Sequence, residues 1–402
     1  MVPLLRYPAR SPVSSGASSL LCNIVVLTMI ILALLCLEAD STMTGPIRVA
    51  ACHAAPVFLS AKATTQKAVS FIKIASRSSA NLVIFPETYI PAFPVWSAMR
   101  APTQNHELFK QMAEQSILAD GEEVQALQSA AQETRTYLSV GISERTRYSS
   151  GALFNSNIFI GPDGRVLNLH RKLMPTFFEK LTWAPGDGHG LNVIETPFGK
   201  IGSLICGENT NPLARYTLIA QAEQLHISTW PAVWPTRVAD PKSAQETAGK
   251  NYDNVAANRI RAAAHCFEAK AFGVLCSGHL DDQAIETIAT GASDAEHIKD
   301  VLRTSQRGAT MFLDPTGAPL PGFTVDATGK KSEVDFLQKE EGILYADLNL
   351  ADCVEGKQYH DVVGSYQRHD IFKLAVNRER QVPIRFHDPP PLPAERDNQK
   401  VL

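Results

Sequence analysis

The sequence contains few cysteines, and none of them forms a recognisable pair. Seven cysteines occur in 402 residues, which is an odd number, and no two have C-x-x-C spacing. Disulfide-stapled domains usually carry an even set, and structural zinc sites usually take paired ligands. The sequence therefore predicts neither a disulfide framework nor a bound metal, and it favours a reducing compartment, the cytoplasm.

Blocks of like charge are also missing. The net charge is −3, and charged residues make up 20% of the chain. Because nucleic-acid-binding domains usually present concentrated basic surfaces, we expect no nucleic-acid partner. The chain also has no P-loop, no G-x-S-x-G motif and no internal repeats, and "GDGHG" (186–190) is too short for a dinucleotide fingerprint.

Only the N-terminus holds a long apolar run. Residues 20–37 read LLCNIVVLTMIILALLCL, at the lower edge of the length that spans a membrane. Two interpretations remain open. In the first, residues 1–42 are dispensable, because they are a removable leader or because the start was assigned upstream of Met43. In the second, residues 20–37 are a genuine membrane or export segment. The protein is expected to contact a membrane only in the second case.

From residue 46 onward, short apolar runs alternate with helical patterns, which is typical of one α/β domain with mixed strand pairing. We place this domain at 43–380, and a proline-rich polar tail at 381–402. The expected strands are 47–52, 81–86, 137–143, 199–206, 223–230 and 271–278, with a hairpin over 151–172 and closing segments at 308–320 and 342–348. The expected helices are 64–80, 121–136, 245–270 and one that starts at Pro212 after an Asn211 cap, whereas 281–307 and 321–341 are expected to be loops or insertions.

Three of these strands stop at residues that can carry chemistry. The strand ends lead to Glu87, Lys172 and Cys206. Taken singly, the cysteine fits a core thiol and the two charges fit solvated loops. Together they supply a nucleophile, a base that can make its thiolate, and a cation for negative charge that develops on a substrate. Ends of strands are also where α/β sheets place reactive groups.

At these residues the sequence resembles the nitrilase branch of the nitrilase superfamily of carbon–nitrogen hydrolases. The glutamate, lysine and cysteine segments of that family are matched by LVIFPETYIPAFP, HRKLMPTFFEKLTWAPGDG and GSLICGENTNPLARYTLIAQAEQLHISTWPA. Two further matches, NRIRAAAHCFEAKAFGVLCSG and HDVVGSYQRHDIFKL, follow in order. The resemblance covers residues 46 to 375.

The resemblance implies a four-layer α-β-β-α sandwich and an enzyme without a metal or organic cofactor. It implies hydrolysis of a small nitrile to the carboxylic acid and ammonia. It assigns Cys206 as nucleophile, Glu87 as general base, Lys172 as the group that stabilises charged intermediates, and Glu179 as the second family glutamate. It also implies a homo-oligomer, either a dimer or a spiral assembly.

The surroundings of the cysteine give further expectations about substrate binding. Many nitrilases have tryptophan after the cysteine, where this chain has Gly207, and this departure leaves the substrate preference open. Tyr89, Trp183 and Trp230 are candidates for the pocket wall, although aromatic residues in such positions are often core. The turn that starts at Cys206 is expected to point amides at the sulfur and so to favour its thiolate.

Other functions remain possible from the sequence alone. An amidase, or a relative that only hydrates nitriles or cyanide, would share the same residues. A non-catalytic assembly protein would not need all three of them. A thiol redox sensor built on Cys206 would respond to peroxide and would release no ammonia from a nitrile.

Overall fold

The computed structural model describes residues 45–235 and 253–384. The chain divides into a unit that ends at Gly45 and a second unit from Pro46 onward, and only the second is considered below. The apolar run at 20–37 lies outside the described residues. Within them, no helix combines the length and apolarity that a membrane crossing requires.

The larger of two sheets has eight strands in the order β13-β12-β15-β1-β2-β3-β4-β5. Strands β1, β2 and β3 are parallel, and the other neighbours are antiparallel, so the mixed pairing is confirmed. The strands are β1 (Ile47–His53), β2 (Leu82–Ile84), β3 (Tyr137–Thr146), β4 (Ser149–Ile160), β5 (Val166–Arg171), β12 (Gly322–Val325), β13 (Lys331–Val334) and β15 (Gly342–Leu348).

The smaller sheet follows the order β11-β10-β9-β8-β7-β6, and β14 pairs with β10 beside this path. Its centre is parallel, because β7, β8 and β9 run in the same direction. The strands are β6 (Ile194–Thr196), β7 (Gly199–Ile205), β8 (Leu225–Trp230), β9 (Phe272–Ser277), β10 (Thr310–Leu313), β11 (Pro319–Leu320) and β14 (Phe336–Leu337).

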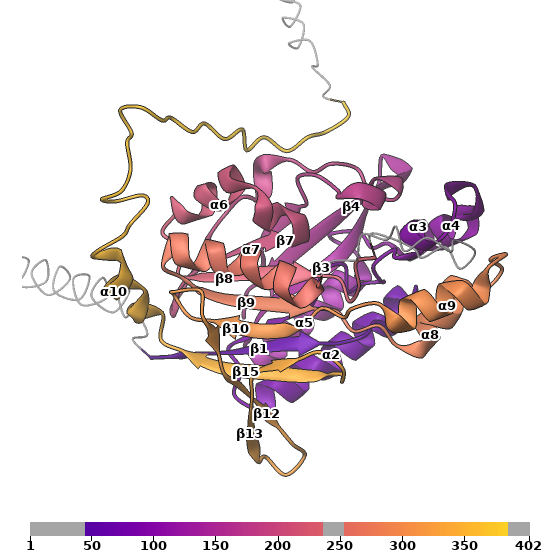
Figure 1. The fold of residues 1–402 in the computed structure, drawn as a ribbon, viewed down its shortest axis with the longest axis horizontal. Coiled ribbons are helices and arrows are strands. Elements are labelled where there is room, and N and C mark those ends of the chain that lie inside the picture. Colours follow the sequence, from indigo (N-terminus) through magenta and orange to yellow (C-terminus); the bar gives the residue numbers. More distant parts are fainter. Residues whose placement is uncertain (1–44, 236–252, 385–402) are drawn as a thin grey trace, which may run out of the picture. The chain divides into compact units, whose positions relative to one another are not determined.

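The two sheets pack face to face, and helices cover their outer faces. In β1, alternate side chains such as Val49 and Ala51 meet Ile227 and Val274 of the smaller sheet. The remaining β1 side chains face α2 (Ala61–Arg77) and α5 (Glu122–Thr134). Helices α6 (Pro212–Ile219) and α7 (Asn254–Ala269) pack on the opposite face of the smaller sheet (Figure 1). The expected four-layer sandwich is therefore confirmed.

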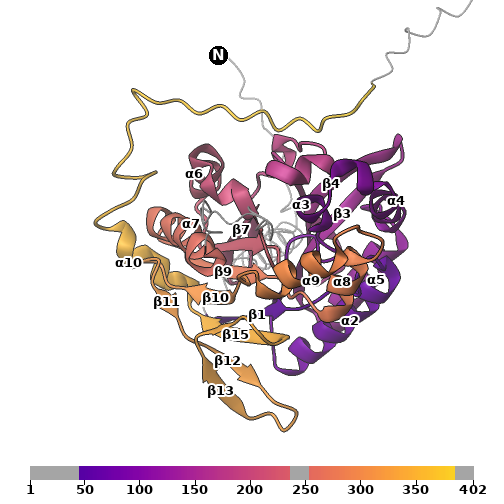
Figure 2. The same cartoon turned by 45° about the vertical axis from the view of Figure 1, so that its right-hand side comes forward.

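Two segments that the sequence favoured as loops are regular structure. Residues 281–307 form α8 (Asp282–Ala289) and α9 (Ala295–Thr304), whereas 321–341 supplies β12, β13 and β14. For 281–307 the loop interpretation was wrong because the apolar residues of α8 and α9 sit at helical spacing. They pack in one cluster with apolar residues of α3 (Trp96–Met99) and α4 (His106–Gln115). Figure 2 shows the ribbons of these four helices.

The helix expected at 245–270 is described only in part. Helix α7 begins at Asn254, and the Asp253 carboxylate accepts hydrogen bonds from the amides of Val255 (2.8 Å) and Ala256 (3.1 Å). Residues 245–252 lie outside the described residues. The Asn211 cap is confirmed, because its side chain accepts from the amides of Leu213 and Ala214.

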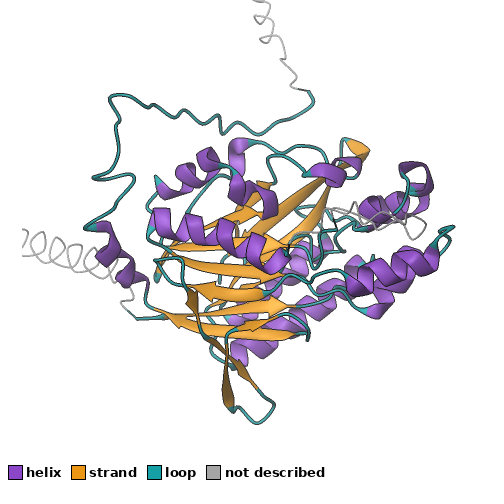
Figure 3. Cartoon of the chain, in the orientation of Figure 1, coloured by secondary structure: helices purple, strands orange, loops and turns teal. Residues whose placement is uncertain are grey.

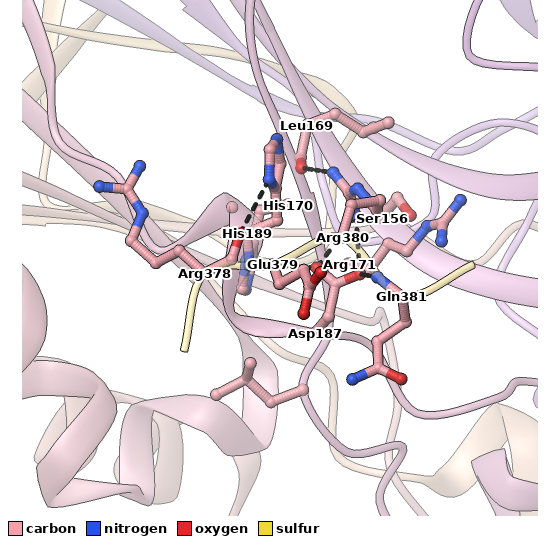
Figure 4. A network of polar contacts seen from close by, with 12 residues as sticks. Ser156, Leu169, His170, Arg171, Asp187, His189, Arg378, Glu379, Arg380 and Gln381 are labelled. Atoms are coloured by element: carbon pink, nitrogen blue, oxygen red, sulfur yellow. Dashed lines mark hydrogen bonds and ion pairs between the residues drawn. The ribbon is translucent and has the colours of Figure 1, made fainter. Parts of the chain in front are cut away.

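After α10 (Cys353–Lys357), the described chain continues without further helix or strand (Figure 3). Its far end is tied to the loop after β5. Arg380 pairs with Asp187 and donates to the carbonyl of Leu169, and the amide of Gln381 also donates to Asp187 (Figure 4). The structure describes only 381–384 of the predicted tail, so its boundary stays a prediction.

Candidate active site

The ends of three strands from both sheets bring the expected residues together. Glu87 follows β2, Lys172 follows β5, and Cys206 follows β7. The loop that carries Glu87 crosses directly over Gly141 of β3. A Cβ atom at residue 141 would lie 2.1 Å from the carbonyl oxygen of Pro86, so only glycine permits this approach.

Lys172 lies between two carboxylates in a fully buried cluster. Its Nζ donates to Glu87 Oε1 at 2.8 Å, and to Glu179 Oε1 at 2.8 Å and Oε2 at 2.7 Å. All three side chains have 0% exposure. These contacts use the three N–H donors of an ammonium group, so its position is fixed on every side.

Glu87 has one anchored oxygen and one free oxygen. Oε1 accepts from Lys172 and also from Asn155 Nδ2 at 2.7 Å, whereas Oε2 is buried and has no partner. Buried polar atoms without a partner are uncommon and costly, and they often mark sites of function. The geometry leaves Oε2 available to accept a proton.

Cys206 lies beside these carboxylates in a left-handed backbone conformation. Its φ is +49°, a region that costs a non-glycine residue energy and that often occurs at functional sites. One carboxylate oxygen of Glu87, one of Glu179 and the sulfur of Cys206 all lie within 4.8 Å of one another. Because Lys172 already bridges the two carboxylates, the cluster is arranged for proton transfer rather than as a cage for a metal ion.

The thiol of Cys206 is held in its protonated form, contrary to expectation. Burial raises its pKa well above the usual value, and the charge of Glu87 raises it further, while Lys172 opposes this change. The turn over residues 206–210 is only a five-residue 3-10 helix, so its amides do not outweigh these effects. A base must therefore remove the proton when the sulfur attacks.

The pKa values of Lys172 and Glu179 are also shifted. Burial would lower the pKa of Lys172, but Cys206, Glu179 and Glu87 together raise it well above its usual value, so the group stays an ammonium. Burial raises the pKa of Glu179 to about 7, against the attraction of Lys172, and Glu87 adds to the rise. Two carboxylates around one ammonium leave an excess negative charge, which a proton on Glu179 relieves.

A buried glutamate holds the start of the cysteine turn. Glu208 accepts from the amides of Ile205 (2.8 Å) and Leu173 (2.6 Å), and its Oε2 lies 2.9 Å from Nε2 of His170. Burial would raise the pKa of Glu208, but His170 and these amides lower it. The carboxylate therefore links the cysteine segment to the lysine segment.

A second buried network supports the other side of the turn. Asn209 donates to the carbonyl of Cys206 at 3.0 Å, and its Oδ1 lies 2.8 Å from Nε2 of His226. Glu223 then contacts both His226 and His265. Burial opposes the ionisation of Glu223, but the two histidines lower its pKa to about 2.

The expected pocket residues separate into three groups. Tyr89 lines an apolar cavity on the Glu87 side of the site, together with Phe93 and His279. Trp230 and Gly207 line a second cavity that reaches Cys206.

Trp183 lines neither of these two cavities. It belongs to the apolar cluster of α3, α4, α8 and α9, where its Nε1 donates to Ser143 at 3.1 Å. Its ring lies edge-on to Phe93, which lines the Glu87-side cavity, so Trp183 supports that wall from behind.

Sequence reasoning missed Asn155, Thr176 and Arg261. Asn155 projects from the buried part of β4, and a polar amide between the apolar residues of a buried strand is a signal that could have identified it. Thr176 caps the turn that carries Glu179, and its amide donates to Glu179 Oε2 at 2.9 Å. Arg261 lies on α7 and had no local signal, since it reaches the site only through packing.

Comparisons with known proteins place this α-β-β-α sandwich among the hydrolases that act on carbon–nitrogen bonds. The sequence model of the family described as Carbon-nitrogen hydrolase matches residues 48–358. The chain is 31% identical to a protein of Penicillium rubens named Nitrilase, over 87% of this chain and 99% of that one. It is 30% identical to a protein of Hypocrea virens named Arylacetonitrilase, over 84% of this chain and 94% of that one.

A solved structure shares the fold. The carbon-nitrogen hydrolase from Helicobacter pylori G27 superposes with a TM-score of 0.58 at 17% identity, over 82% of this chain and 97% of that one. Together with the family match along most of the chain, these findings show that the protein belongs to the carbon-nitrogen hydrolase family.

Proposed function

We propose that this protein is a nitrilase, which hydrolyses an organic nitrile to the carboxylic acid and ammonia with Cys206 as the nucleophile. The observation that carries the proposal is the asymmetry of Glu87. Its Oε1 is held by Lys172 and Asn155, while Oε2 has no partner beside a protonated thiol. The names of relatives that align over most of the chain support the nitrile as substrate.

In the first half of the reaction, Glu87 takes the proton of Cys206, and the sulfur adds to the carbon of R–C≡N. The nitrogen gains electron density and receives the proton from Glu87, which yields a thioimidate. Lys172 stabilises the negative charge that develops on the nitrogen. A positioned donor of this kind typically contributes about a hundredfold or more in rate.

In the second half, Glu87 removes a proton from a water molecule that attacks the thioimidate carbon. Glu87 passes this proton to the nitrogen and then transfers the hydroxyl proton of the tetrahedral intermediate to it as well. The C–N bond breaks, a thioester remains on Cys206, and ammonia leaves with both protons of the water molecule. A second water molecule cleaves the remaining thioester, which releases R–COOH and returns the proton to Cys206. The sum is R–CN plus two water molecules to R–COOH plus ammonia. Glu179 holds Lys172 in place throughout.

The other functions fit the site less well. A redox sensor needs an accessible thiolate, whereas Cys206 is buried and its pKa is raised. A non-catalytic protein would have no use for a buried, charged cluster that is costly to maintain. An amidase shares the acyl-enzyme steps and is separated by the experiment below.

Cys206→Ala tests the proposal. We expect no ammonia from a panel of aliphatic, aryl and arylaceto nitriles, with an unchanged far-UV circular dichroism spectrum, because the substitution removes only the sulfur. In the unmodified protein, a slowly hydrolysed nitrile should add a covalent mass to the peptide containing residue 206. Release of ammonia from an amide faster than from the matching nitrile would indicate an amidase. Activity that survives in the alanine variant would refute the assignment.

We also propose that the protein forms a homo-oligomer through α6 and α7. These helices expose large apolar side chains: Leu213 is 61% exposed, Ile260 70% and Phe267 47%. Exposed apolar patches of this kind often mark protein interfaces. Sedimentation velocity of the intact chain and of a Leu213→Asp/Ile260→Asp variant decides this, since the variant should sediment as a smaller species.

A cytoplasmic location is proposed on the state of the cysteines. The five cysteines within the described residues are free and buried. Free thiols without disulfides are typical of reducing compartments. A fluorescent fusion of the full chain that followed a membrane or left the cell would contradict this location.

A further inference from the structure

The cavity that reaches Cys206 is polar, unlike the cavity on the Glu87 side. Its described lining includes Cys206, Gly207 and Trp230, and three polar residues from α7: Asn254, Asn258 and Arg261. The Glu87-side cavity is lined mostly by alanine, proline, phenylalanine and valine side chains. A substrate bonded to Cys206 therefore has a polar cavity beside it, with the α7 side chains on its wall.

Arg261 is held in a fixed position above Trp230. Its guanidinium carbon lies 4.5 Å from the centroid of the indole ring. Its Nε donates to the carbonyl of Ala257 at 2.8 Å, and Nη2 donates to Asn258 Oδ1 at 3.0 Å. Stacking on an aromatic face and two hydrogen bonds restrict the group without neutralising its charge.

The charge of Arg261 has no counter-ion among the residues that the structure describes. Arg215, by contrast, forms a two-bond ion pair with Glu268. A guanidinium group has five N–H donors, and Arg261 uses two of them in the contacts above, which leaves three. The indole Nε1 of Trp230, also on the cavity wall, is buried without a partner.

We propose that Arg261 binds a carboxylate of the substrate, so that the preferred substrates are short nitriles that carry a carboxylate a few bonds from the cyano group. This inference rests on the proposed nitrilase function and specifies its substrate class. The guanidinium fork suits a planar carboxylate, and its placement beside Cys206 would orient the cyano carbon toward the sulfur. Between its cyano group and its carboxylate, such a substrate needs only a short chain.

A second role of Arg261 must be separated from this one. Its positive charge also lowers the pKa of the Cys206 thiol, although less than Lys172 does. Loss of the charge would therefore slow every substrate to some extent. The ratio of kcat/KM for an anionic nitrile to that for its neutral isostere cancels this effect, because both share the same nucleophile.

The experiment compares three pairs of equal shape: cyanoacetate with 3-methylbutanenitrile, 3-cyanopropanoate with 4-methylpentanenitrile, and 4-cyanobutanoate with 5-methylhexanenitrile. Each is assayed by ammonia release with the intact enzyme and with Arg261→Gln, Arg261→Lys and Arg259→Gln. Arg259 is an exposed arginine on the same helix and serves as the matched control.

In at least one pair, the unmodified enzyme should prefer the anion, and Arg261→Gln should reduce the anion-to-neutral ratio about 10- to 100-fold, the usual effect of losing a charged hydrogen-bond partner. Arg261→Lys should recover part of the ratio, and Arg259→Gln should leave it unchanged. Equal losses for both members of every pair would overturn the proposal and leave a role in thiol activation only. Absence of ammonia from all six compounds and from the wider nitrile panel would refute the nitrilase function itself.

Binding without turnover gives an independent readout, which also serves if Arg261→Gln fails to fold. In the Cys206→Ala background, isothermal titration calorimetry with the best anionic nitrile should show binding that weakens by about threefold or more on adding Arg261→Lys, since lysine keeps the charge but cannot form the two-bond contact. Equal affinity in both proteins would overturn the proposal.

Discussion

Replacing Glu179 with glutamine should change how the stability of the protein depends on pH. In the folded state the pKa of Glu179 is raised to about 7 from its ordinary value of 4.5, because burial and the charge of Glu87 outweigh Lys172. The folded chain therefore binds this proton more tightly than the unfolded chain. Stability from this group is complete below pH 4.5 and is lost as the pH rises through 7.

The magnitude follows from the same values. A tenfold change in proton affinity corresponds to about 1.4 kcal/mol, so the rise to about 7 is equivalent to about 3 kcal/mol of unfolding free energy. Glutamine keeps the shape of Glu179 and cannot ionise. The unfolding free energy of Glu179→Gln minus that of the unmodified protein should therefore increase by about 3 kcal/mol between pH 4.5 and pH 8.

Urea unfolding, followed by tryptophan fluorescence at the two pH values under reducing conditions, measures this difference. Glu195→Gln is the control, because Glu195 is 79% exposed and its pair with Lys200 should contribute almost nothing. A difference that is the same at both pH values would show that Glu179 ionises normally. A difference that decreases with pH would show that attraction to Lys172 dominates, and the reasoning about excess charge would be wrong.

Three further predictions concern the parts around the site. A Cβ atom at residue 207 would lie 2.6 Å from Oγ1 of Thr176, so Gly207→Ala should lower the unfolding free energy by about 1–3 kcal/mol and should also lower kcat. Adding Thr176→Ala should restore part of the rate. A double variant no faster than the single one would contradict the steric cause. Glu223→Gln should lower the unfolding free energy by about 1–3 kcal/mol, because two buried histidines lose a carboxylate partner. The control Glu195→Gln should hardly lower it. Equal effects of the two substitutions in denaturant titrations would show that the network is dispensable. A chain that begins at Met43 should express and hydrolyse nitriles like the full chain, since the first described strand starts at Ile47, and loss of both properties would place the leader within the fold.

Local sequence patterns predicted most strands and helices because each pattern reflects a single interaction. The runs that became β1, β2 and β7 are apolar because both faces of these strands are covered. The helix after Asn211 could be placed because the cap and Pro212 act within one turn. Helix α8 was within reach of the same reasoning, since Asp281 caps it by accepting from the amide of Ala284 at 2.8 Å. The hairpin of β12 and β13 was not, because β12 becomes regular by pairing with β15, and the polar edge strand β13 becomes regular by pairing with β12.

The sequence by itself determined which chemical groups stand at the ends of strands, and its resemblance to a known family predicts that Glu87, Lys172 and Cys206 take part in one reaction. The identities of these residues are given by the order of amino acids along the chain, and they can be recognised by comparison with the family's segments. Only the tertiary structure decided how each group behaves. The free oxygen of Glu87 depends on Asn155, which lies 68 residues away, and the raised pKa of the Cys206 thiol depends on burial between layers. Proton affinity and hydrogen-bond partners are set by distance and solvent exclusion, and these exist only once the two sheets have packed.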